Sequence, residues 1–108
     1  MSSASTASAQ ITEEVAAWPA VQAGPGRRGE FAFRVGRREI GHLHGDRAAH
    51  FFFPKAIWLD LRHQGRIVEH PVFPGRQGPA ARRIENAADV RDVVELMRLN
   101  YDLATASR

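Results

Sequence analysis

The chain contains no cysteine, which excludes disulfide bonds, thiolate metal ligands and a cysteine nucleophile. Serine occurs only near the two ends of the chain, so a serine–histidine–aspartate triad is not expected in the folded part. No apolar run approaches the roughly 20 residues that a membrane-spanning helix needs. The first residues also lack the basic and apolar pattern of a secretory signal. We therefore expect a cytoplasmic protein.

The positive charge of the chain comes almost entirely from arginine and is concentrated in the middle. Lys55 is the only lysine, and the formal net charge is +3. Residues 27–83 carry a net charge of +7, whereas residues 1–26 and 84–108 carry −2 each. A basic middle can attract phosphate groups, so a nucleic-acid-binding module is one hypothesis. A solvated sheet surface of ordinary composition is the other interpretation of this charge.

A length of 108 residues, of which 44% are hydrophobic, indicates one globular domain with a modest core. Residues 1–10 are rich in serine, alanine and threonine and have little to bury, so we expect a disordered tail there. A single domain is expected over residues 11–105.

Three helices are predicted from capping residues and apolar spacing. The first begins at Thr12, which can act as its cap, and ends at Pro19. The second spans residues 55–64 and is closed by Gly65. The third is capped by Asn86 and has one apolar stripe, formed by Val90, Val94, Met97 and Tyr101.

A strand is predicted over residues 30–35, where apolar and polar residues alternate, and further strands are predicted over residues 39–44, 49–53, 67–73 and 80–84. Residues 20–29 are expected to form an irregular connection. Pro71 interrupts one predicted strand, which indicates a sheet edge or a bulge. The expected fold is α+β, with a small antiparallel sheet of about five strands, helices packed on one face, and the order α-β-β-β-α-β-β-α.

His42 and His44 lie two residues apart on a predicted strand and must therefore point to the same face. An odd number of residues in the preceding turn would place them with Arg34 on the outer face. An even number would place them on the apolar face. We favour the even register, because a two-residue Gly36-Arg37 turn suits glycine in first place and keeps Ile40 inside.

A His-x-His pair supplies two ligands for zinc or iron, which need a third and usually a carboxylate. His50, His70 and Asp46 are the available additional ligands. A metal-dependent enzyme centred on His42 and His44 is therefore one hypothesis. The other interpretation is a structural role, in which the imidazoles make hydrogen bonds within a half-buried sheet.

Several stretches, in order along the chain, resemble the small bacterial "luciferase domain" proteins. They are RVGRREIGHLHGD (34–46), FP (53–54), EHPVFP (69–74) and ADVRDVVELMRLNYDLA (88–104). The end of the last stretch, ELMRLNYDLA, is also similar to the final helix of YjbR-like proteins, whose α+β fold agrees with the predicted elements. The chain departs from the luciferase-domain pattern at residues 78–81, where Gly-Pro-Ala-Ala replaces the usual aromatic strand.

The resemblance implies that Gly41, His42, His44 and His70 belong to the pattern of that family. Luciferase chemistry would need a flavin or luciferin pocket, which the residues do not indicate, and the sequence requires no cofactor. We therefore expect a small binding or interaction module rather than an enzyme. Its partner would be an anionic small ligand, a metal or nucleic acid. The expected ligand-binding residues are His42, His44, His70, Asp46, Arg34 and Arg38, with His42 and His44 as the candidate metal ligands.

Overall fold

A computed structural model describes residues 5–106, which form one six-stranded sheet and three helices. The elements are α1 (Ala7–Val15), β1 (Val21–Pro25), β2 (Phe31–Val35), β3 (Arg38–His44), β4 (Ala48–Phe52), α2 (Lys55–His63), β5 (Val68–Glu69), β6 (Pro79–Arg83) and α3 (Ala87–Ala106). The order α-β-β-β-β-α-β-β-α contains one strand more than predicted. The predicted α+β class and antiparallel sheet are confirmed.

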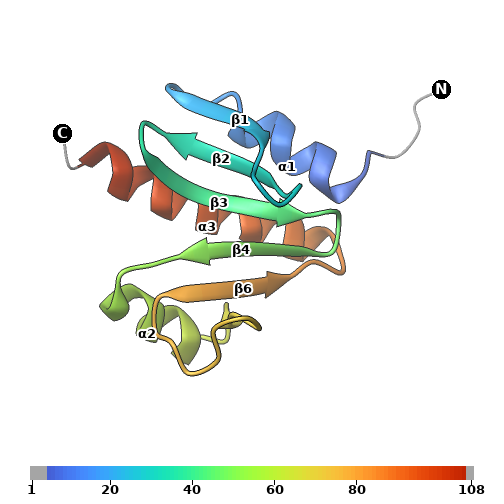
Figure 1. Ribbon diagram of the computed structural model, residues 1–108. Helices are drawn as coiled ribbons and strands as arrows, with labels where there is room; N and C mark the ends of the chain where they lie inside the picture. The colour runs from blue at the N-terminus through green and yellow to red at the C-terminus, as the bar shows by residue number, and fades with distance from the viewer. Residues whose placement is uncertain (1–4, 107–108) are drawn as a thin grey trace.

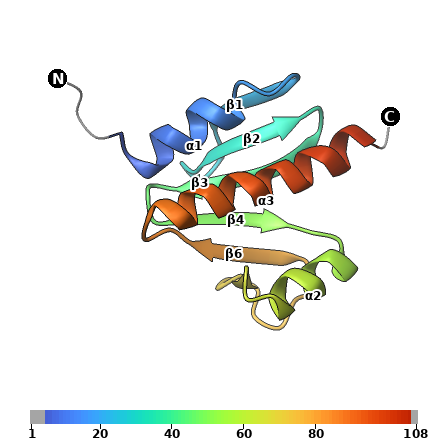
Figure 2. The same ribbon diagram turned by 180° about the vertical axis from the view of Figure 1, so that it is seen from behind.

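The strands lie in the order β1-β2-β3-β4-β6-β5, and each neighbouring pair is antiparallel. Helices α1 and α3 lie behind the sheet in Figure 1 and in front of it in Figure 2, so both cover the same face. Helix α2 lies beyond β6 at the lower end of both views. We call the face opposite α1 and α3 the open face. Strand β5 is an edge strand, as predicted, but it covers only two residues of the predicted range 67–73 and ends before Pro71.

Helix α3 provides much of the core, because its apolar stripe packs against the middle of the sheet. Asn86 caps it as predicted, since the Asn86 side chain accepts a hydrogen bond from the Asp89 backbone at 2.9 Å. The buried side chains of α3 are Val90, Val93, Val94, Leu96, Met97, Asn100 and Tyr101. Within residues 5–106, no helix combines the length and apolar character needed to cross a bilayer.

The turn between β2 and β3 has the predicted length. Val35 pairs with Arg38, which leaves Gly36 and Arg37 as the two turn residues. Gly36 has a φ angle of +60°, a conformation that glycine adopts without steric cost. The predicted two-residue turn is therefore confirmed. The face on which His42 and His44 lie is determined further along β3.

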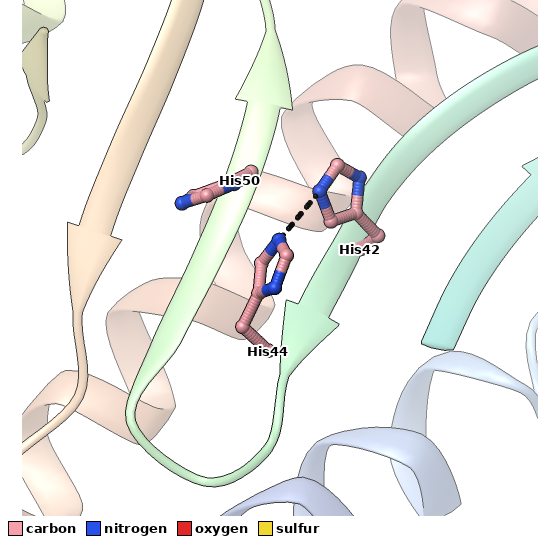
Figure 3. Close-up of side chains that lie close together, drawn as sticks. All are labelled: His42, His44 and His50. Atoms are coloured by element: carbon pink, nitrogen blue, oxygen red, sulfur yellow. Dashed lines mark hydrogen bonds between the residues drawn. The ribbon is translucent and has the colours of Figure 1, made fainter. Parts of the chain in front are cut away.

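A β-bulge at Ile40 reverses the alternation of β3. Beyond the bulge, Ala32 pairs with His42, and both Ile40 and Gly41 face the helices. His42 and His44 consequently lie on the open face, on the side away from α3 (Figure 3). The favoured prediction that they share the apolar face was wrong, because periodicity alone does not include the extra residue of a bulge.

Two residues make the bulge compatible with the packing of α3. The buried amide of Asn100 donates hydrogen bonds to the carbonyl oxygens of Ile40 at 3.3 Å and Phe52 at 3.1 Å. Gly41 lets the helix approach closely, because a Cβ atom there would lie 2.5 Å from Sδ of Met97. Both residues therefore hold β3 against the helix layer.

Two regions near the N-terminus differ from the prediction. Helix α1 is capped by Thr6, which accepts from the Ala9 backbone at 3.1 Å, so the helix begins before the predicted cap at Thr12. Of the predicted tail over residues 1–10, residues 1–4 lie outside the described part and residues 7–10 are helical. Burial of Ile11 and Val15 against the core explains why this small-residue segment is folded.

Strand β1 occupies part of the segment that was predicted to be an irregular connection. Its residues are all exposed or only partly buried, and it ends at a proline. Such an edge strand lacks the clear alternation on which strand prediction depends. Strand β6 forms as predicted, although small residues replace the aromatic ones that the family resemblance implied there.

Candidate functional site

Three histidines from the two central strands of the sheet converge on the open face. His42 and His44 come from β3 and His50 from β4, where His50 pairs directly with His42 (Figure 3). One ring nitrogen from each of the three lies within 4.8 Å of the others. The Nε2 atoms of His42 and His44 are 3.1 Å apart. We call these residues the histidine triplet.

Glu39 orients the ring of His42. Oε2 of Glu39 lies 2.7 Å from Nδ1 of His42, so the Nδ1–H group donates to the carboxylate. The proton of the neutral ring is thereby held on Nδ1, and Nε2 accepts the hydrogen bond that joins it to Nε2 of His44. Pairs of this kind fix the ring orientation and raise the basicity of metal-binding histidines in other proteins.

His50 is the most buried member of the triplet, with 9% of its surface exposed. Its Nδ1 atom is buried and has no hydrogen-bond partner among the described residues. Burial, followed by the neighbouring His70, His44 and His42 rings, lowers the pKa of His50 to about 4. His50 is therefore a neutral imidazole near pH 7, which is the state that binds metals.

His70 follows β5 and lies beside the triplet, with its ring centroid 4.1 Å from that of His50. Its Nδ1 atom accepts a hydrogen bond from the Val72 backbone at 3.1 Å. The neutral ring then carries its proton on Nε2 and can donate it to an acceptor. Burial, with smaller effects of His42 and His44, lowers the pKa of His70. His70 is suited to contact a ligand rather than a metal.

The histidines line a cavity of about 330 Å³ on the open face. Its walls are formed by Arg27, Arg28, Glu30, Arg34, His42, His44, His50, His70, Val72 and Phe73. The carboxylate of Glu30 accepts from the Arg28 backbone at 3.0 Å. Hydrogen bonds from its own backbone and from Arg28 lower the pKa of Glu30, so this group is a carboxylate near pH 7.

The three arginines of this wall, Arg27, Arg28 and Arg34, are named the cavity arginines. Within residues 5–106 their guanidinium groups have no carboxylate within 4.0 Å. Other arginines of the basic middle are paired: Arg66 lies 2.6 Å from Asp92, and Arg82 lies 2.7 Å from Asp89. The acidic α3 thus neutralises part of the basic middle, which does not favour a broad nucleic-acid-binding surface.

The structure brings together four of the six predicted ligand-binding residues, namely His42, His44, His70 and Arg34. Asp46 lies elsewhere, because its Oδ1 atom accepts from the Ser8 backbone at 2.8 Å at the start of α1. Arg38 reaches the helix side, where it donates to Oδ1 of Asn100 at 3.0 Å. Neither lines the cavity.

His50 is one of the additional metal ligands that the sequence offers, but it is not one of the six predicted ligand-binding residues. The two-residue period of a strand predicts that His50 lies on the open face. Ala49 and Phe51 are buried in the core, so His50 between them must point the other way. The cavity arginines Arg27 and Arg28 had no comparable signal, because they lie in a turn that periodicity does not describe.

Comparison with known proteins gives a family but no individual relative. No match was found among curated proteins or among solved structures. The luciferase-domain family matches residues 37–100, which is more than half of the chain. The matched range runs from the β2–β3 turn into α3 and includes all members of the histidine triplet and His70. The chain therefore belongs to the luciferase-domain family.

Proposed function

We propose that this protein is a metal-binding module in which the histidine triplet holds a divalent transition metal of the zinc class. The observation that carries the proposal is the convergence of ring nitrogens from His42, His44 and His50 within 4.8 Å. Imidazole nitrogen is a preferred ligand of zinc, copper, nickel and iron. No cysteine competes for such a metal in this chain.

The spacing of the rings suits one ion after a small adjustment. Two nitrogens that bind a tetrahedral zinc at about 2.0–2.1 Å lie roughly 3.3 Å apart. The Nε2 atoms of His42 and His44 already have a similar separation, 3.1 Å. The ring nitrogen of His50 lies within 4.8 Å of the other two, so a shift of at most about 1.5 Å would bring it to the same distance.

The surroundings of the triplet also support a metal site. Glu39 supplies the carboxylate partner that metal-binding histidines commonly have. Three protein ligands leave a fourth position on a tetrahedral zinc, and here that position would face the cavity. Sites with such an open position bind an exogenous ligand or water, whereas purely structural zinc sites are closed.

A purely structural role for the histidines accounts less well for His50. A buried polar atom without a hydrogen bond costs about 1–3 kcal/mol, so a structural imidazole normally finds a partner. Nδ1 of His50 has none among the described residues. Coordination of Nδ1 by a metal would remove this cost, which supports the metal-binding interpretation.

The test is a zinc titration of chelator-treated full-length protein, followed by calorimetry and by the NMR signals of the histidine rings. We expect the rings of the triplet to shift together, with a stoichiometry of one. His50→Ala should weaken zinc binding by more than about 100-fold, since loss of a ligand exceeds the effect of a second-sphere change. His63→Ala is the matched control, because His63 is exposed at the end of α2. Equal zinc affinity of both variants would overturn the proposal.

A further inference from the structure

We infer that the cavity beside the triplet binds a small aromatic carboxylate, with its anionic group toward the cavity arginines and its ring against Val72 and Phe73. The inference rests on the proposed metal site, because the carboxylate would also occupy the open position of the metal. It assigns a ligand class to a cavity that metal binding alone leaves unexplained.

The arrangement of the cavity gives the ligand a charged end and an apolar end. The triplet forms the floor on the central strands β3 and β4. Arg34 on β2 and the turn that carries Arg27 and Arg28 lie on the side of β2. Val72 and Phe73 follow β5 at the other end of the sheet. A ligand that spans the floor therefore meets cations on one side and apolar groups on the other.

The charge of the wall favours an anion. The wall contains the three cavity arginines and one carboxylate, that of Glu30, and a second carboxylate, that of Glu39, lies behind it on His42. Both carboxylates already have partners: Glu30 accepts from the Arg28 backbone, and Glu39 binds the ring of His42. The guanidinium groups are thus left to bind an added carboxylate, for which their planar donor geometry is well suited. His70 adds a further donor through Nε2.

The apolar side of the cavity favours a ligand with a ring over a simple inorganic anion. Val72 is 62% exposed and Phe73 is 42% exposed. Side chains of this kind lose contact with water when an aromatic ring packs on them. The volume of about 330 Å³ lies near the lower end of ligand pockets, which limits the ligand to a small molecule.

The probe is benzoate, titrated into the zinc-loaded protein, with acetate and benzamide as comparators. Acetate keeps the charge without the ring, and benzamide keeps the ring without the charge. We expect benzoate to bind at least about tenfold more tightly than either comparator, since the cavity offers partners for both parts. Binding of benzamide as tight as that of benzoate would overturn the inference.

Two triple variants with the same change of net charge separate the cavity from the general basic character of the chain. One replaces the cavity arginines by glutamine: Arg27→Gln, Arg28→Gln and Arg34→Gln. The control replaces exposed arginines that do not line the cavity: Arg37→Gln, Arg47→Gln and Arg62→Gln. Benzoate affinity should fall at least about tenfold in the first variant and by less than twofold in the control. Equal effects of the two variants would refute the assignment.

Zinc affinity is measured on the same samples, so the two proposals fail in different ways. Absence of zinc binding in the unaltered protein would overturn the proposed function and, with it, the contact between ligand and metal. Zinc binding at the triplet without benzoate binding would overturn only the inference about the ligand. Zinc binding that persists in the cavity-arginine variant, together with loss of benzoate binding, would support both.

Discussion

Replacement of Asn100 by alanine tests how the bulge in β3 is held in place. Asn100 is fully buried on α3, and its amide donates to the carbonyl oxygens of Ile40 and Phe52. Its oxygen accepts a hydrogen bond from Arg38. The Ile40 carbonyl belongs to the bulge residue, which the strand ladder leaves without its regular partner. We expect Asn100→Ala to lower the free energy of unfolding by about 2–5 kcal/mol.

The magnitude follows from the three hydrogen bonds that are lost. The bond to Ile40 is buried, so its carbonyl would remain unsatisfied at a cost of about 1–3 kcal/mol. The bonds to Phe52 and from Arg38 are partly buried, and water can replace them at a cost of about 0.5–1 kcal/mol each. The truncated side chain also leaves a small void beneath the sheet.

Urea denaturation followed by tryptophan fluorescence measures this loss, and Asn86→Ala is the matched control. Asn86 is an asparagine of the same helix, but it caps the exposed N-terminus, where truncation costs about 1 kcal/mol. A loss for Asn100→Ala no larger than that for Asn86→Ala would refute the role of Asn100 in the bulge. We also expect weaker zinc binding in Asn100→Ala, since a shifted bulge moves His42 and His44.

Three further predictions concern the strand and the site. Gly41→Ala should lower the free energy of unfolding, measured in urea, by about 1–3 kcal/mol, because its Cβ would collide with Met97. Gly24→Ala is the control: a Cβ atom there has no neighbouring atom within 4 Å, so the free energy of unfolding should change by less than about 0.5 kcal/mol. Glu39→Gln should weaken zinc binding by about 10–100-fold in calorimetry with little change in unfolding. Stability should fall as the pH drops from 6.5 toward 4, because the folded-state pKa of His50 is lowered to about 4 and protonation therefore favours the unfolded chain. The loss due to His50 is at most about 3–4 kcal/mol and is measured by urea denaturation at several pH values. If a His50→Gln variant had the same pH dependence as the unaltered protein, this prediction would be contradicted.

The elements of the fold could be predicted where local chemistry determines them. Asn86 caps α3 and Gly36-Arg37 forms the turn, because capping and turn formation depend on the residues of that segment alone. Thr6 and Thr12 offer the same capping chemistry, and the choice between them depends on burial of Ile11 against the core. Such a choice is made by tertiary packing and is not encoded in the local pattern.

The candidate site was only partly predictable for a related reason. The pairing of His42 and His44 on one face follows from the two-residue period of a strand and is confirmed. Their joint position with His50 depends on the strand register between β3 and β4. Asp46 and Arg38 are close to the histidines in sequence, yet a turn and the bulge direct them toward α1 and α3. Proximity along the chain is therefore a poor guide to the cavity.

The bulge connects the core and the site through one glycine. Ile40 and Gly41 both face the helices, so two successive residues share a space that a regular strand would give to one. A second large side chain could not fit beneath Met97, and glycine at position 41 removes that conflict. The next residue, His42, is then directed to the open face together with His44. Gly41 thus has no ligand atom to contribute, but the position of the histidine triplet depends on it.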